Sequence, residues 1–215
     1  MRPLTAELPK PLLSVGGRPL IEHHILNLKT AGFDELIINV SYLGEQIADF
    51  CGDGSRWGIS ITLSHEDRPL ETAGGIVKAL PWLSSGPFLV VNGDVYTDYP
   101  FATLRNRQLG EASAHLVLVD NPPHHLRGDF LLKDSSHIGQ PDLDTDRVDG
   151  ALTFSGMALY HPTFFAGLSQ GKLPLKPLLD RAITRGTLTG EHFPGAWMDV
   201  GTPERLAALN HQLVT

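Results

Sequence analysis

The segment FLVVNGDVYTD, residues 88–98, carries the clearest local signal of the fold. Its apolar start is of strand length and runs directly into Asn92, Gly93 and Asp94. In a sheet of parallel strands, ligands bind at the carboxyl ends of the strands, which is where Asp94 would stand. A plain Asn-Gly turn followed by a solvated aspartate is the alternative interpretation of the same residues.

Outward from this segment, short apolar runs alternate with stretches of helical periodicity. Strands are predicted at residues 36–40, 59–63, 88–92, 114–119 and 153–160. Helices are predicted at residues 18–31, 43–50, 74–80, 176–184 and 202–213. Alternation of this kind indicates parallel strands joined by crossover helices. The predicted fold class is therefore α/β, with a doubly wound, mostly parallel sheet flanked by helices.

Residues 105–150 depart from this alternation, because they are rich in Pro, Gly, Asp and His. We expect long loops around a short hairpin here, with 140–149 as a flexible surface insertion. The whole chain, residues 1–215, is long enough to bury one substantial core. We therefore expect a single domain.

The composition excludes several classes of protein. Lys and Arg number 17 against 24 Asp and Glu, and the net charge of −7 argues against a broad surface for nucleic acid or anionic membrane. No segment approaches the roughly 20 apolar residues that span a bilayer. Cys51 is the only cysteine, which favours a reducing, cytoplasmic setting. Ten histidines are present without HExxH spacing, so a histidine metal site is disfavoured.

A second aspartate strengthens the interpretation of Asp94. In GAWMDVGTPERL, residues 195–206, Asp199 ends a short apolar run just before a helix with Thr202 as its N-cap and Pro203 at its first position. Two carboxylates from distant segments often converge on one Mg²⁺ in phosphoryl or nucleotidyl transfer. Asp94 and Asp199 are thus candidate metal ligands.

Two further features could contact phosphate. Lys10 lies between Pro9 and Pro11, so it stands outside a regular helix interior and could present a point charge, although a solvated lysine is the alternative. Gly74 and Gly75 are expected to open a helix whose amides face a ligand, or simply to form a loose helix start. Neither a GxGxxG fingerprint nor a P-loop is present.

Taken together, these motifs resemble those of the sugar-1-phosphate nucleotidyltransferases, the nucleotide-sugar pyrophosphorylase family. The resemblance extends over nearly the whole chain and rests on PLT (3–5), PKPLL (9–13), GGRPLI (16–21), PLETAGG (69–75), VNGD (91–94) and WMDVGTPERL (197–206). It implies the Rossmann-like fold of the nucleotide-diphospho-sugar transferases and Mg²⁺ as cofactor. The short length, without the C-terminal β-helix domain of longer relatives, is most similar to the bacterial N-acetylmuramate alpha-1-phosphate uridylyltransferases of cell-wall recycling. DNPPHHLRGDF (120–130), FSGMALYHP (154–162) and GEHFPG (190–195) carry that narrower resemblance.

The resemblance also implies roles for individual residues. Lys10 would contact the nucleotide phosphates, and Asp94 and Asp199 would bind Mg²⁺, which makes these three the expected catalytic residues. The expected nucleotide-binding residues are Lys10, Glu66, Glu71, Thr72, Ala73, Gly74, Gly75 and Asn92. The expected sugar-phosphate-binding residues are Gly128, Thr153, Gly156 and Lys176.

The implied reaction is attack of a sugar 1-phosphate oxygen on the α-phosphorus of a nucleoside triphosphate, with release of pyrophosphate and no covalent enzyme intermediate. UTP and N-acetylmuramate 1-phosphate are the substrates that the narrower resemblance implies. A mannose-1-phosphate guanylyltransferase-like enzyme is the alternative. Because the assembly domains of longer relatives are lacking, we expect a monomer.

The sequence departs from the family at its start. Members carry LAAGxGxR, then two further residues, then PLT; Met1 and Arg2 occupy those two intervening positions here, so the sequence starts after LAAGxGxR. The printed chain therefore lacks the first strand, its glycine loop and the loop arginine. We expect residues upstream of Met1 in a working enzyme, and the alternative is a truncated, non-catalytic protein that binds a nucleotide sugar.

Overall fold

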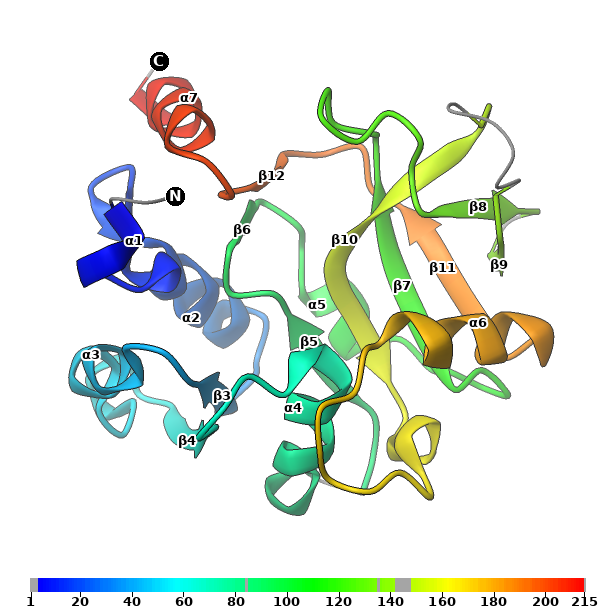
Figure 1. The fold of residues 1–215 in the computed structure, drawn as a ribbon, viewed down its shortest axis with the longest axis horizontal. Coiled ribbons are helices and arrows are strands. Elements are labelled where there is room, and N and C mark those ends of the chain that lie inside the picture. The colour runs from blue at the N-terminus through cyan, green and yellow to red at the C-terminus, as the bar shows by residue number, and fades with distance from the viewer. Residues whose placement is uncertain (1–3, 84, 135, 142–147, 215) are drawn as a thin grey trace. The chain divides into compact units, whose positions relative to one another are not determined.

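The computed structural model describes residues 4–83, 85–134, 136–141 and 148–214 (Figure 1). The chain divides into two compact units, which are described separately. Unit 1 comprises Met1–Leu70, Gly93–Asn106 and Ala196–Thr215, and unit 2 comprises Glu71–Asn92 and Arg107–Gly195.

The described residues of unit 1 form three small two-stranded sheets. Its elements are α1 (Leu4–Glu7), η1 (Lys10–Leu12), β1 (Ser14–Val15), β2 (Arg18–Pro19), α2 (Leu20–Thr30), β3 (Glu35–Val40), α3 (Gly44–Cys51), η2 (Ser55–Trp57), β4 (Ser60–His65), β6 (Val95–Thr97), α5 (Ala102–Arg105), β12 (Trp197–Asp199) and α7 (Pro203–Val214). Strands β3 and β4 pair in parallel, while β1 with β2 and β6 with β12 pair antiparallel.

Helix α2 shows why the helical predictions hold. Its apolar residues recur at helical spacing, so Leu20, Ile25 and Leu28 are buried along one face. The helix ends where Gly32 adopts a φ of 89° and donates its amide to Lys29 O, a common way for glycine to end a helix.

Apolar cores among the described residues hold unit 1 together. One lies among α2, α3, β3 and β4 and is built from Ile21, Ile25, Val40, Ile47, Cys51, Trp57, Ile59 and Ile61. Another joins α7 to the N-terminal hairpin, which is formed by β1 and β2. It is built from Leu13, Val15, Leu20, Val200 and Leu209. Because Val200 is fully buried there, the chain is anchored immediately after Asp199.

Unit 2 contains a six-stranded sheet. Its elements are α4 (Glu71–Ala79), η3 (Leu80–Trp82), β5 (Phe88–Val91), β7 (Ala114–Val119), β8 (Phe130–Lys133), β9 (His137–Gly139), β10 (Ala151–Tyr160), η4 (Pro162–Phe165), α6 (Lys176–Thr184) and β11 (Leu188–His192). The strand order is β5-β10-β7-β11-β9-β8, and β8 also pairs with β10. Five of these strands, β10, β7, β11, β9 and β8, therefore close into a ring, with β5 outside it.

The mixed α/β class is confirmed, but the predicted mostly parallel, doubly wound sheet is not what the described residues form. Among their strand pairs only β3–β4 and β7–β11 are parallel. The alternation of strands and helices favoured a parallel sheet, whose strands are covered on both faces, and β7 is indeed buried at every position. Closure into a small barrel buries both faces of a strand equally well.

Within residues 105–150, the predicted hairpin is present as β8 and β9, which pair antiparallel through Leu132 and Ile138. The predicted surface insertion at 140–149 falls largely on residues 142–147, which lie outside the described residues.

Candidate active site

Strands β6 and β12 bring the two predicted metal ligands together. Asp94 directly precedes β6 and Asp199 is the last residue of β12, and in the antiparallel register Asp199 lies opposite Val95. The amide of Val200 donates to the carbonyl oxygen of Asp94 at 2.7 Å. The predicted convergence of the two aspartates is therefore present in the backbone of unit 1.

Each of these carboxylates contacts a cation. Lys10 Nζ lies 3.1 Å from Asp94 Oδ2, and Arg205 Nη1 lies 2.9 Å from both carboxylate oxygens of Asp199. Two neighbouring carboxylates repel each other unless positive charge is near. The lysine and the arginine supply that charge, as a metal ion would.

The lysine is displayed by the short helix η1. Leu13 donates its amide to Lys10 O at 3.0 Å, and Pro9 and Pro11 flank the lysine. The prediction that Lys10 stands outside a regular α-helix is confirmed. The structure adds that its ammonium group lies at Asp94.

The arginine was missed from the sequence, where it reads as an ordinary helix-surface charge. Thr202 Oγ1 accepts a hydrogen bond from the Arg205 amide at 3.3 Å, which confirms Thr202 as the N-cap of α7. The cap places Arg205 in the first turn, close enough to reach back to Asp199.

The donor set of this pair fits Mg²⁺. Carboxylate oxygens are hard ligands, and Mg²⁺ is usually held by one or two carboxylates with water and substrate phosphates completing its shell. The described part of the chain contains no group of three or more His, Cys, Asp or Glu side chains suited to a metal. Asp94 and Asp199 thus match an ion that is shared with a phosphate substrate, rather than a caged structural metal.

Beneath this site, His24 of α2 is buried and supports β6. Burial is the main reason that its pKa falls to about 4, while a hydrogen bond with the Val95 backbone opposes the shift. The ring is therefore neutral at physiological pH. His24 thus belongs to the buried face of its helix, together with Leu20, Ile21, Ile25 and Leu28.

Glu66, in unit 1, uses its carboxylate locally. Its Oε2 accepts the Leu70 amide at 3.0 Å, and its own amide donates to Val40 O at 2.7 Å. The side chain therefore shapes the turn at 66–70 that follows β4.

The ETAGG segment, in unit 2, differs from its prediction. Helix α4 begins at Glu71 rather than at Gly74, so both glycines are buried within the helix instead of opening it. The amide of Gly74 donates to Leu173 O at 3.2 Å and is not open to a ligand. Glu71 itself has a φ of 60° and pairs with Lys172 at 3.1 Å. A left-handed, non-glycine residue of this kind is strained, and such strain is common at binding sites.

Asn92 and Gly156 are brought together in unit 2. The Asn92 amide donates to Gly156 O at 2.9 Å, and Gly156 lies in a bulge of β10 between Phe154 and Met157. At Gly156, with a φ of 80°, a Cβ would lie 2.5 Å from Asn92 Nδ2. Only glycine allows this approach.

Gly128 and Thr153 are also brought together, through Asn121. Thr153 Oγ1 donates to Asn121 Oδ1 at 2.9 Å, and a Cβ on Gly128 would lie 2.8 Å from the same oxygen. Asn121 was missed from the sequence because it sits in a Pro-rich stretch that reads as a loop. Lys176, by contrast, pairs with Asp180 one turn along α6.

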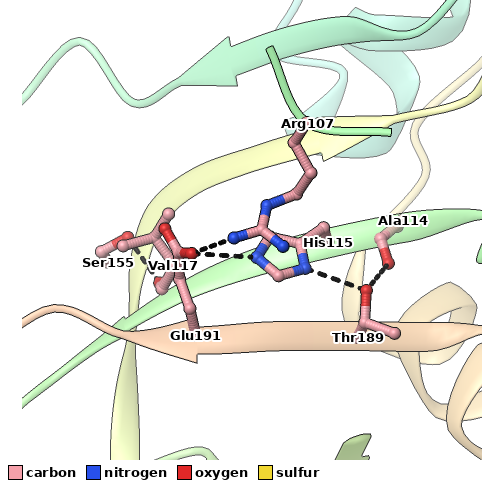
Figure 2. Close-up of polar contacts among 7 residues, drawn as sticks. All are labelled: Arg107, Ala114, His115, Val117, Ser155, Thr189 and Glu191. Atoms are coloured by element: carbon pink, nitrogen blue, oxygen red, sulfur yellow. Dashed lines mark hydrogen bonds and ion pairs between the residues drawn. The ribbon is translucent and has the colours of Figure 1, made fainter. Parts of the chain in front are cut away.

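A further polar cluster of unit 2 was not predicted from the sequence (Figure 2). The Arg107 guanidinium pairs with Glu191 Oε2, and His115 Nε2 lies 3.6 Å from the same oxygen. His115 Nδ1 is 2.9 Å from Thr189 Oγ1. The cluster ties β7 to β11, and strands distant in sequence give no signal of such pairing.

No helix among the described residues combines the length and apolar character needed to cross a membrane.

Comparison with known proteins identifies the family to which the chain belongs. The profile of the nucleotidyl transferase family matches residues 1–130. The N-acetylmuramate alpha-1-phosphate uridylyltransferase of Neisseria meningitidis serogroup B is 48% identical over 211 residues, which cover 96% of this chain and 90% of the relative. Mannose-1-phosphate guanylyltransferase 1 of Arabidopsis thaliana is 30% identical over 217 residues, and the match covers 94% of this chain but 58% of that longer relative.

Two solved structures share the fold at low sequence identity. A Bacillus anthracis protein assigned as a glucose-1-phosphate thymidylyltransferase matches with a TM-score of 0.86 at 21% identity, covering 99% of this chain and 89% of that one. HddC from Yersinia pseudotuberculosis matches with a TM-score of 0.79 at 19% identity, covering 96% and 90%. With the family profile matching more than half of its length, this chain belongs to the nucleotidyl transferase family.

Proposed function

We propose that this protein transfers UMP from UTP to N-acetylmuramate 1-phosphate, giving a UDP-sugar and pyrophosphate in cell-wall recycling. The identity of 48% to an enzyme of that name, over nearly the full length of both chains, supports the choice of substrates. We further propose that the two units form one nucleotidyltransferase domain acting as a cytoplasmic monomer.

The observation that carries the proposal is the Asp94–Asp199 pair with Lys10 beside it. The two aspartates would hold Mg²⁺ together with the triphosphate of UTP. When bound, the ion neutralises phosphate charge and orients the α-phosphate for in-line attack. Lys10 contacts Asp94 at 3.1 Å, so its ammonium group is already at the place where phosphate charge would arrive.

The remaining candidate residues would bind the other parts of the substrates. Glu66 and the Glu71–Gly75 segment would recognise the uracil ring, with Asn92 beside the nucleotide. Four residues would contact the sugar phosphate, namely Gly128, Thr153, Gly156 and Lys176. The Gly128–Asn121–Thr153 contacts support grouping Gly128 with Thr153, and the Asn92–Gly156 contact supports adjacent sites for the nucleotide and the sugar phosphate. No nucleophile is required, so positioning and charge supply the rate enhancement.

A substrate panel tests the proposal. Pyrophosphate release is measured with Mg²⁺ for UTP, GTP and dTTP, each paired with N-acetylmuramate 1-phosphate, N-acetylglucosamine 1-phosphate and mannose 1-phosphate. We expect UTP with N-acetylmuramate 1-phosphate to give the highest kcat/KM. Equal or better turnover of GTP with mannose 1-phosphate would overturn the substrate assignment.

The guanylyltransferase alternative has one observation in its favour, the match covering 94% of this chain to the Arabidopsis relative. The panel separates it directly. Tight binding of UDP-sugar without turnover of any pair would instead identify a binding protein.

A further inference from the structure

The contact between Arg205 and Asp199 is built more tightly than an ordinary surface ion pair. Arg205 Nη1 lies 2.9 Å from each carboxylate oxygen, and the two side chains are only 24% and 29% exposed. Contacts to both oxygens of a carboxylate fix its orientation. Arginine keeps its charge at every physiological pH. The pairing therefore does not depend on protonation of the arginine.

Gly201 provides the space for this contact. A Cβ there would lie 2.0 Å from Arg205 Nη2 and 3.0 Å from Asp199 Oδ2. Gly201 does not have a positive φ, so its backbone conformation would suit other residues. A side chain at this position would displace the guanidinium, so glycine leaves the room that the Arg205–Asp199 contact uses.

The position of Arg205 on α7 also favours a specific role. A cation in the first turn of a helix opposes the helix dipole, which favours anions there. Arg205 nevertheless occupies that turn, where the Thr202 cap fixes its backbone. Its charge is compensated by Asp199 rather than by the helix.

The helix itself is held firmly. Asn210 Oδ1 accepts the Gly16 amide at 2.7 Å, while its Nδ2 donates to Ser14 O at 3.1 Å. Leu209 is buried in the core beside Val200. Arg205 therefore projects from a helix whose position is fixed against the N-terminal hairpin.

We propose that Arg205 is a positioning residue that fixes the Asp199 carboxylate for a divalent cation, and that Gly201 exists to admit it. This inference rests on the proposed function, in which Asp94 and Asp199 bind Mg²⁺. A residue that orients a metal ligand changes metal affinity by about 10- to 100-fold when it is removed.

The test measures Mn²⁺ affinity by water-proton relaxation in the presence of UTP, without sugar phosphate. We expect Arg205→Ala to raise the Mn²⁺ dissociation constant about 10-fold or more, with Arg205→Lys in between because lysine keeps the charge but not the length and planar shape of the guanidinium. Gly201→Ala should weaken binding in the same direction by displacing the guanidinium. In the double variant, Gly201→Ala should add less than about twofold, since coupled sites are not additive.

Two controls make the outcomes distinct. Arg18→Ala removes an exposed arginine of the same unit, 3.8 Å from Glu22, and should leave the Mn²⁺ constant unchanged. Thermal melting of each variant reports on folding separately from metal binding.

Unchanged or tighter Mn²⁺ binding in folded Arg205→Ala would overturn the inference, showing a structural ion pair or a competitor for the metal. If Asp94→Asn and Asp199→Asn abolish Mn²⁺ binding in that case, the proposed metal site itself stands. If those two variants bind Mn²⁺ normally, the metal site and the inference both fall.

Discussion

At the scale of single residues, substitution of Lys10 distinguishes a catalytic role from a structural one. Its ion pair with Asp94 is 39% exposed on both sides, and pairs of that exposure contribute little to folding. We predict that Lys10→Met lowers kcat/KM for UTP by about 100-fold or more, by the usual scale for a lost charge donor, with little change in melting temperature. Lys10→Arg should retain part of the activity. Full activity of Lys10→Met would contradict the assignment.

His24, also a single residue, makes the free energy of unfolding depend on pH. The unfolded chain binds a proton on this histidine below about pH 6.5, whereas the folded chain does so only near pH 4, because burial lowers the pKa. The free energy of unfolding therefore falls as pH drops from 6.5 towards 4, by about 2 kcal/mol at pH 5 from this group. Urea denaturation of wild type and His24→Asn at pH 7.5 and 5 measures it. The account fails if both proteins lose the same stability.

At the scale of elements, the bulge of β10 depends on Gly156. Alanine there would adopt an unfavourable positive φ and would press on the Nδ2, Cγ and Cβ atoms of Asn92, which rotation of that side chain cannot clear. We predict that Gly156→Ala costs about 2–4 kcal/mol of unfolding free energy. The matched control is Gly167→Ala, since Gly167 has a φ of 76° with nothing within 4 Å of a Cβ. It should cost about 1–2 kcal/mol. Equal losses would mean that Asn92 is not a close neighbour.

Helix α3 offers a second test at this scale. It ends at Cys51, which is 1% exposed, and burial raises the pKa of the thiol to about 11. We predict that iodoacetamide at pH 8 labels the folded protein at least about 100-fold more slowly than the protein in urea. Intact-mass measurement follows the reaction, with Cys51→Ser as the unlabelled control. Rapid labelling of the folded protein would show that α3 does not pack on β4 as described.

The elements also show what the sequence could predict. Helices α2, α6 and α7 were predictable because their apolar periodicity and end signals act over a few residues. Strands β6 and β12, with three residues each, were not, since they are shorter than any pattern of alternation. Closure of the ring depends on pairing between distant strands, such as β8 with β10. No pattern within a short stretch of sequence indicates that pairing.

At the scale of the whole molecule, the ordered motifs indicated the family, and the family is shown. The convergence of Asp94 and Asp199 was predictable because both follow apolar runs. The contacts of Arg205 and Asn121 were not predictable, because each depends on the position of a helix or a loop in the folded structure. Sequence thus indicated the chemistry of the site better than the residues that hold it in place.

The central claim is that the Asp94–Asp199 pair supports Mg²⁺-dependent uridylyl transfer. Its most direct test is pyrophosphate release from UTP and N-acetylmuramate 1-phosphate by wild type, Asp94→Asn and Asp199→Asn, with Mg²⁺ or with EDTA. The account predicts turnover by wild type with Mg²⁺ alone and a loss of about 100-fold or more in each variant, all three proteins being folded. Turnover by wild type in EDTA, or by either variant at the wild-type rate, would contradict it.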